Sequence, residues 1–101
     1  MPVEAMKIPE IALKLDPQTP EAKAAIGFEY TESLIGTRSK IGGAPDWMQS
    51  PVDVQCDFCR TSMSFYAQID SVGDNVILAD CGMIYVFVCF GCFESKSLVQ
   101  C

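Results

Sequence analysis

The stretch that decides the fold is CDFCRTSMSFYAQID, residues 56–70. It opens with a Cys-x-x-Cys pair, Cys56 and Cys59, and runs on into a segment where apolar and polar side chains alternate. A period of two is typical of a β-strand with one buried face. A second pair, Cys89 and Cys92, stands at the end of another apolar segment. The spacing therefore predicts that strands carry the two cysteine pairs toward one another.

The strand after Cys59 is expected to bury one set of alternating side chains. Met63, Phe65, Ala67 and Ile69 form the apolar set, and the polar set is Ser64, Tyr66, Gln68 and Asp70. We also expect Asp70, like Asp74 in the following GDN turn, to be solvated. The segment CGMIYVFVC, residues 81–89, is aromatic and β-branched, which predicts a central strand buried on both faces.

Shorter elements are predicted on either side. VILA at 76–79 and SKSLVQC at 95–101 are expected to form a short strand and a final edge strand, and residues 11–15 one more short strand. TPEAKAAIG, residues 19–27, carries helix signals: Thr19 as N-cap, Pro20 at the first helical position and Gly27 as a stop. Residues 28–36 are consistent with either a strand or an irregular segment.

These elements predict a mainly β fold: a small antiparallel sheet with a zinc-ribbon-like four-cysteine site and one short N-terminal helix. We expect one domain overall, because 101 residues is a common domain length. Within it, residues 1–37 are expected to form an N-terminal arm with the short helix, packed or partly mobile. Residues 38–101 are expected to form the zinc-ribbon-like β domain.

The two Cys-x-x-Cys pairs indicate a metal site. Two tight turns brought together by a sheet can direct four thiolates at one ion, which suits tetrahedral Zn²⁺. We therefore expect a structural zinc ion bound by Cys56, Cys59, Cys89 and Cys92. Cys81 and Cys101 lie outside this pattern, and we expect a small buried apolar side chain at the first and a free thiol at the second.

Other chemistry for the cysteine pairs is less consistent with the sequence. A thioredoxin-like pair opens a helix, whereas Cys56 and Cys59 lead into a predicted strand. Two disulfides would require an oxidising compartment, and the charged start of the chain shows no signal peptide, so we expect a cytoplasmic location. An iron–sulfur cluster also takes four cysteines but usually draws them from more closely spaced runs.

The composition argues against catalysis, nucleic acid and membranes. The chain contains no histidine, so the commonest general base is missing, and a closed four-cysteine site leaves no position for water or substrate. We therefore expect no enzymatic activity. Thirteen acidic residues against seven basic ones give a net charge of −6, which opposes binding to phosphate backbones. The longest apolar run, residues 83–90, is too short to span a bilayer.

Four segments in order carry a resemblance to a known family: SKIGGAPDWMQSP, CDFCRTSMSFYAQIDS, DCGMIYVFVCFGC and SLVQC. Together they cover about residues 38–101, and the sequence resembles the bacterial YwqG-like domain of unknown function. It is similar, more distantly, to the amino-terminal region of programmed-cell-death-protein-two proteins. The positions that match the family pattern are Gly42, Gly43, Pro45, Trp47, Gln49, Gln68, Asp70 and the four paired cysteines.

The resemblance implies a mainly β protein that contains a zinc ribbon and has no defined activity. The eukaryotic relatives are regarded as chaperones that bind a ribosomal protein, and some bacterial relatives lie near toxin systems. From the residues themselves, Trp47 is expected to fill the core, and Gln49 and Gln68 to satisfy backbone groups near a turn. The alternative is that Trp47, Met48 and Gln49 form a partner-binding patch, since Trp and Met are enriched at interfaces.

We therefore predict a small, non-enzymatic protein-interaction module, adaptor-like or chaperone-like, stapled by structural zinc. Its partner is expected to be a protein. One alternative is an immunity-type inhibitor whose acidic surface covers a basic toxin site. A second alternative is a thiol-based redox or metal-responsive protein, which would need a labile thiolate.

Overall fold

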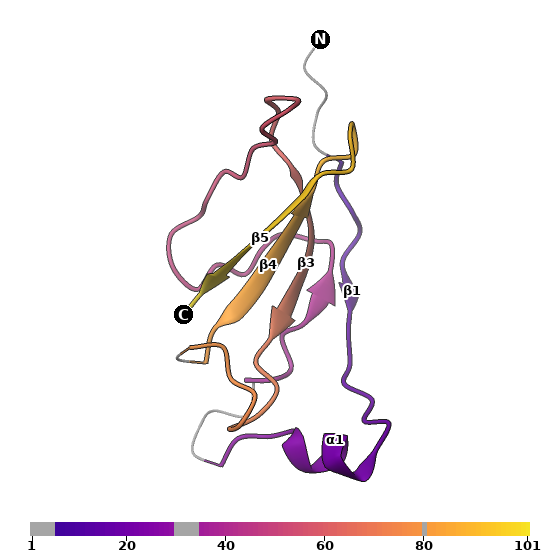
Figure 1. Ribbon diagram of the computed structural model, residues 1–101, viewed down its shortest axis with the longest axis vertical. Coiled ribbons are helices and arrows are strands. Elements are labelled where there is room, and N and C mark those ends of the chain that lie inside the picture. The colour runs from indigo at the N-terminus through magenta and orange to yellow at the C-terminus, as the bar shows by residue number, and fades with distance from the viewer. Residues whose placement is uncertain (1–5, 30–34, 80) are drawn as a thin grey trace.

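The fold is a five-stranded antiparallel sheet whose strands follow one another in chain order, β1-β2-β3-β4-β5 (Figure 1). The computed structural model describes residues 6–29, 35–79 and 81–101. The strands are β1 (Ile11–Ala12), β2 (Lys40–Ile41), β3 (Ser64–Asp70), β4 (Met83–Val88) and β5 (Ser95–Gln100). One short helix, α1 (Pro20–Ala25), lies below the sheet in Figure 1. The predicted mainly β fold class is confirmed.

The N-terminal arm joins the same sheet as the cysteine-bearing strands. Ile11 of β1 pairs with Ile41 of β2, and Ile41 pairs in turn with Ala67 of β3. The predicted helix is also confirmed, because Thr19 caps it by accepting a hydrogen bond from Ala22 N–H at 3.0 Å. Of the segment at 28–36, residues 30–34 lie outside the described residues.

A bulge in β3 changes which side chains enter the core. Phe65 pairs with Phe87 and Ala67 with Val86, so Tyr66 is an extra residue in β3. One extra residue moves every later side chain to the opposite face. The predicted burial of Ile69 is therefore wrong, since it is 40% exposed. Gln68 and Asp70 are buried instead, at 0% and 3% exposure.

Strand β4 is an interior strand of the sheet, between β3 and the edge strand β5. Its burial on both faces is not found. Met83, Tyr85 and Phe87 are buried, whereas the alternating residues Ile84, Val86 and Val88 are half-buried. The difference arises because residues 46–50, which we call the covering segment, pack against one face of the sheet, which we call the inner face.

The covering segment contains Trp47. Its ring lies 4.8 Å from the Tyr85 ring and is stacked on Phe87 at 6.0 Å between centroids. The Tyr85 hydroxyl donates to Asp46 O at 2.7 Å and accepts from Met48 N–H at 3.0 Å. One buried strand residue therefore satisfies two backbone groups of the loop that covers it. The expectation that Trp47 fills the core holds only in part, because its side chain is half-buried and packs against the core cluster from the covering segment.

The predicted short strand at 76–79 is wrong. Val76 forms an isolated bridge with Gly73, which closes a tight turn. Leu78 N–H then donates to the Ser71 hydroxyl at 3.0 Å, and Leu78 O accepts from Gly82 N–H at 2.7 Å. These bonds turn the chain back toward β4. Residues 76–79 therefore belong to a turn and not to a strand, although they are apolar.

Membrane insertion through a helix has no support in residues 6–29, 35–79 and 81–101. Within these ranges we find no helix with the length and apolar character that crossing a bilayer requires.

Candidate metal centre

The first cysteine pair lies in a tight turn just before β3. Cys56 N–H donates to Thr61 O and Cys56 O accepts from Arg60 N–H, both at 2.9 Å. Arg60 has a φ of 56°, in the left-handed region that lets the chain reverse. A further contact joins Cys59 N–H to the Cys56 sulfur at 3.5 Å. The turn therefore places both sulfurs on the same side.

The second pair lies in a turn with the same hydrogen bonds at the same sequence offsets. Cys89 N–H donates to Glu94 O at 2.8 Å, and Cys89 O accepts from Phe93 N–H at 2.6 Å. Phe93 stands at the position equivalent to Arg60 and has a φ of 63°. The two turns are thus structural copies of one another, although their sequences share little beyond the cysteines.

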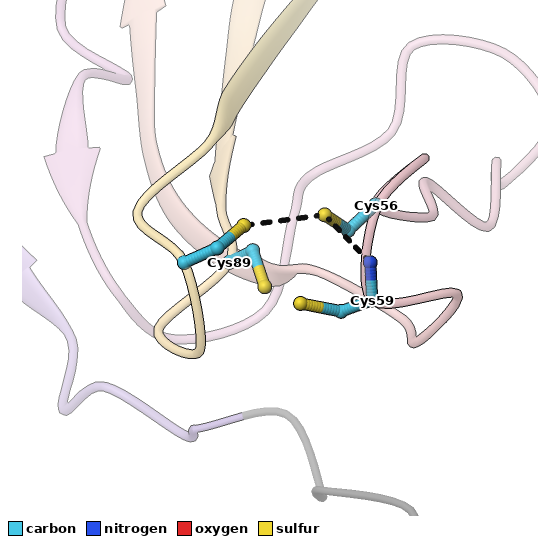
Figure 2. A group of neighbouring side chains, drawn as sticks. Cys56, Cys59 and Cys89 are labelled. Atoms are coloured by element: carbon cyan, nitrogen blue, oxygen red, sulfur yellow. Dashed lines mark hydrogen bonds between the residues drawn. The ribbon is translucent and has the colours of Figure 1, made fainter.

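Strand pairing brings the two turns together. Ser64, at the start of β3, pairs with Val88, at the end of β4, so the turns before β3 and after β4 meet at one end of the sheet. Figure 2 shows Cys56, Cys59 and Cys89 converging there. With Cys92 they form a group whose sulfur atoms all lie within 4.8 Å of one another. The four cysteines predicted as metal ligands are therefore brought together.

The spacing of the sulfurs fits a tetrahedral ion. A Zn–S distance of about 2.3 Å places thiolates at the corners of a tetrahedron about 3.8 Å apart. The distance between the Cys56 and Cys92 sulfurs is 3.5 Å, and the largest in the group is within 4.8 Å, so the observed range brackets this value. Four sulfur donors from two such turns make a site able to hold a metal ion.

The cluster is joined to the hydrophobic core on one side only. Cys56 and Cys89 are buried, at 1% and 4% exposure, and belong to the same core cluster as Met63 and Phe87. Cys59 and Cys92 are exposed. The first cysteine of each turn therefore anchors the site to the sheet, and the second closes it from the solvent side.

Without an ion, the thiols share their protons unequally. Backbone N–H groups of Cys92 and Gly91 point at the Cys89 sulfur and lower the pKa of this thiol to about 7. Hydrogen bonds to the sulfurs of Cys89 and Cys92 raise the pKa of Cys59 to about 12. The thiolate form is thus favoured at Cys89, whereas Cys59 keeps its proton. A bound cation would replace those protons, which is how metal binding couples to pH.

The opposite end of β3 and β4 carries a polar cluster that sequence reasoning missed. Arg38 Nη2 lies 2.7 Å from Asp70 Oδ1, and Arg38 Nε donates to Asp70 Oδ2 at 2.8 Å. Asp70 Oδ2 also accepts from the backbone N–H of Gly36 and of Arg38. Ser71 N–H donates to Asp70 Oδ1 at 2.7 Å.

The expectation that Asp70 is solvated is wrong, since its side chain is 1% exposed. The bulge in β3 turns Asp70 inward, and no composition signal reports that bulge. Burial acts to raise the pKa of Asp70, but the hydrogen bonds from Arg38 and Gly36 outweigh it and hold the pKa below its usual value. The hydrogen bond to Asp70 raises the pKa of Arg38 in turn.

Two glutamines, Gln68 and Gln49, bind the covering segment to the sheet and to the chain end that follows it. Gln68 accepts from Asp46 N–H and donates to Arg38 O, which confirms that it satisfies backbone groups near the turn. Gln49 donates to Cys101 O at 2.6 Å. Trp47 and Met48 are half-buried against the core cluster. These contacts place the predicted partner-binding residues against the inner face, and their role in binding a partner stays a prediction.

The comparisons with known proteins yield no relative. No protein-family model matches the chain, and neither curated proteins nor solved structures contain a match. The resemblance to the YwqG-like family therefore stays a prediction from the sequence.

Proposed function

We propose that the chain is a non-enzymatic protein-interaction module whose sheet is held at one end by a structural zinc ion. The observation that supports this most is the group of four sulfur atoms within 4.8 Å of one another. The ligands would be Cys56, Cys59, Cys89 and Cys92. When bound, zinc would supply four bonds that hold the two turns together, and no chemistry on a substrate.

Zinc is favoured over other ions by the donor set. Four thiolates are soft ligands, which select zinc or an iron centre over magnesium or calcium. The two equivalent turns supply two sulfurs each, and this is the usual ligand arrangement of structural zinc sites. All four coordination positions would be filled by protein, so no position would be left open for a substrate.

A binding role is supported by the surface that this staple would hold in place. The face of β4 opposite the covering segment presents Ile84, Val86 and Val88 half-buried, and Val99 of β5 is 51% exposed. Apolar side chains that neighbour one another on a surface are typical of interaction sites. A small domain with a rigid core and exposed apolar side chains suits an adaptor or chaperone-like role.

The immunity-type inhibitor remains a second candidate, favoured by the net charge of −6. An acidic surface steers association with a basic partner and would suit the cover of a toxin site. A toxin gene beside the gene of this protein would support that candidate.

The third candidate is a redox or metal-responsive protein. It predicts reactive thiols beyond Cys81 and Cys101 when the native protein is titrated with a thiol reagent.

Affinity capture tests the proposed function. The zinc-loaded protein and a chelator-treated sample would be used as baits in an extract of the organism that encodes the chain. We expect a defined protein to be retained by the zinc-loaded bait and lost from the treated one. Retention of nucleic acid alone, or of no macromolecule, would contradict a protein-interaction role.

A further inference from the structure

The end of the molecule that carries the cysteines also carries exposed aromatic rings. Phe58, between the two cysteines of the first turn, is 78% exposed, and Phe93, directly after the second turn's last cysteine, is 74% exposed. These are the largest exposures among the large hydrophobic side chains of the described residues. Phe90 is half-buried and meets Phe93 edge-on at 6.2 Å between centroids. We call Phe58, Phe90 and Phe93 the aromatic tip.

The fold gains little from the two exposed rings. A ring that is about three-quarters exposed buries little apolar area and so contributes little to folding. Phe93 also has a φ of 63°, a backbone conformation that favours glycine or asparagine and costs about 1 kcal/mol for other residues. A bulky aromatic at such a position is unfavourable on both counts. Large exposed apolar side chains in neighbouring turns are typical of a binding surface.

The charges around the aromatic tip are mostly negative. Asp57 and Glu94 lie within the turns and Asp53 lies just before the first of them, whereas the first turn also carries the exposed Arg60. Lys96 is engaged by Asp57 at 3.1 Å and by Gln55 O at 2.8 Å. A zinc ion held by four thiolates adds a further charge of about −2. The electrostatic field at this end therefore attracts cations and repels phosphate groups.

We propose that the aromatic tip docks into a protein partner through an apolar pocket bordered by lysine or arginine side chains. The proposal rests on the proposed function and assigns partner docking to the aromatic tip, with the exposed sheet face of β4 and β5 as the rival surface. Phenylalanine is an effective anchor for such a pocket because it brings a large rigid apolar area at low entropic cost. The net negative charge of the surroundings matches a basic rim, and it disfavours single-stranded nucleic acid and anionic membranes, which need a net positive surface beside the rings.

The two turns provide the rigidity that an anchor needs. Phe58 lies between two sulfur ligands, and Phe93 follows another directly, so a bound ion would fix the backbone at each ring. Presenting rings on a preorganised backbone reduces the entropy lost on binding. The zinc ion that would stabilise the end of the sheet would then also fix the conformation of the binding surface.

Selection of peptides provides the test. A random peptide library displayed on phage would be selected against the zinc-loaded protein, and the enriched peptides synthesised for titration calorimetry. We expect peptides that combine lysine or arginine with apolar residues. Replacing both exposed rings, by Phe58→Ser and Phe93→Asn, should weaken binding about thirtyfold or more, the effect of losing an interface hot spot. Asn suits the left-handed backbone at position 93.

Val99→Ser tests the exposed sheet face as the rival surface. Val76→Ser is the matched control, because it removes an exposed apolar side chain from the turn that follows β3, at the other end of the sheet. We expect it to leave peptide affinity unchanged. Zinc content and thermal unfolding are measured for each variant, and Phe58→Ser alone serves if the double variant loses zinc.

The outcomes separate the tip from the proposed function. If the selected peptides bind Val99→Ser more weakly but bind the Phe58→Ser, Phe93→Asn double variant as tightly as the parent protein, the aromatic tip is not the docking surface. A protein-interaction role would still hold. Enrichment of acidic peptides would contradict a partner pocket that is bordered by lysine or arginine side chains. Failure to enrich any peptide, or tighter binding to a single-stranded oligonucleotide or to phosphatidylserine vesicles, would overturn the tip as a protein anchor. Affinity capture from the extract would then decide the proposed function separately.

Discussion

The two ends of the β3–β4 pair are held by different chemistry. At one end, four cysteine sulfurs from two turns converge within 4.8 Å, and two of these cysteines are exposed. At the other end, the Asp70 carboxylate is enclosed by Arg38 and by backbone N–H groups. Among the described residues, no buried side-chain nitrogen or oxygen lacks a hydrogen-bond partner. One end is complete within the chain, whereas the other would be completed by an ion.

The stability of the cysteine end would depend on a bound metal ion, whereas the stability of the polar end does not. A zinc ion bound to four cysteines can contribute an apparent 10–16 kcal/mol, roughly the whole stability of an ordinary domain, about 5–15 kcal/mol. The polar end contributes less but does not depend on metal supply. Loss of the ion should therefore release the turns and the aromatic tip, and loss of Arg38–Asp70 should weaken the other end without releasing the ion.

The largest expected effect comes from removing one sulfur ligand. Cys59→Ser should abolish cooperative unfolding, because metal binding is coupled to folding and a three-sulfur site binds zinc far more weakly. Thermal unfolding followed by circular dichroism measures this, with Cys101→Ser as the matched control that leaves the four ligands intact. A Cys59→Ser variant with the full thermal stability of the parent protein would show that Cys59 is not a ligand.

The polar end is tested by Asp70→Asn, which removes a charge that is 1% exposed. We expect the free energy of unfolding in urea to fall by about 3 kcal/mol, because the half-buried Arg38 guanidinium loses the buried carboxylate that balances its charge. Zinc content should not change. Asp57→Asn is the control: it breaks an ion pair whose carboxylate is 84% exposed and should cost under about 1 kcal/mol. Equal effects of the two changes would contradict the contrast in burial.

The contribution of the Arg38–Asp70 pair to stability is also expected to depend on pH. The pKa of Asp70 lies below its usual value, so its contribution is present at neutral pH and is lost only as the pH falls through that lowered pKa. The difference in unfolding free energy between the parent protein and Asp70→Asn should therefore be the same at pH 7 and pH 5, measured with zinc-saturated protein. A difference that had already halved at pH 5 would place the pKa of Asp70 above its usual value.

Between the two ends, Tyr85 binds the covering segment. Tyr85→Phe removes a hydroxyl that serves both Asp46 O and Met48 N–H, so the unfolding free energy should fall by about 1–2 kcal/mol. Hydrogen exchange at the Met48 amide should become faster than in the parent protein. Exchange at Cys56 N–H, which is bonded within the first turn, is the internal control and should keep its protection. Unchanged exchange at Met48 would contradict this role of Tyr85.

The smallest effect is expected at Phe93, whose backbone is left-handed and whose ring is 74% exposed. Phe93→Asn should leave the unfolding free energy unchanged or raise it by up to about 1 kcal/mol, since asparagine adopts this backbone more readily. Urea unfolding at constant zinc concentration measures it. A loss of more than about 1 kcal/mol would show that the ring packs on the fold.

How much was predictable from the sequence differs between the two ends. The cysteine spacing and the absence of histidine pointed directly to the four sulfurs, because ligand type and spacing are written into the sequence. Asp70 was misjudged because its burial depends on the bulge at Tyr66, which reverses the alternation. A bulge depends on pairing with β4, so it has no local signature at Tyr66.

Two further features also depend on tertiary contacts. The equivalence of the two turns lies in backbone hydrogen bonds and in the left-handed conformation at Arg60 and Phe93, where the sequence shows neither glycine nor asparagine. The half-buried outer side of β4 depends on which segment covers the sheet, and an apolar run cannot report that. Composition predicted the element, and packing decided its exposure.

Elemental analysis of the purified native protein tests most directly the claim that the four cysteines bind a structural zinc ion. We predict about one zinc ion per chain, and we expect removal of the ion by a chelator to abolish cooperative unfolding. Mass spectrometry of the same sample should show all six cysteines as free thiols once the metal is removed under reducing-agent-free, anaerobic conditions. Absence of zinc, together with intact disulfides among Cys56, Cys59, Cys89 and Cys92 or with iron and sulfide in its place, would contradict it.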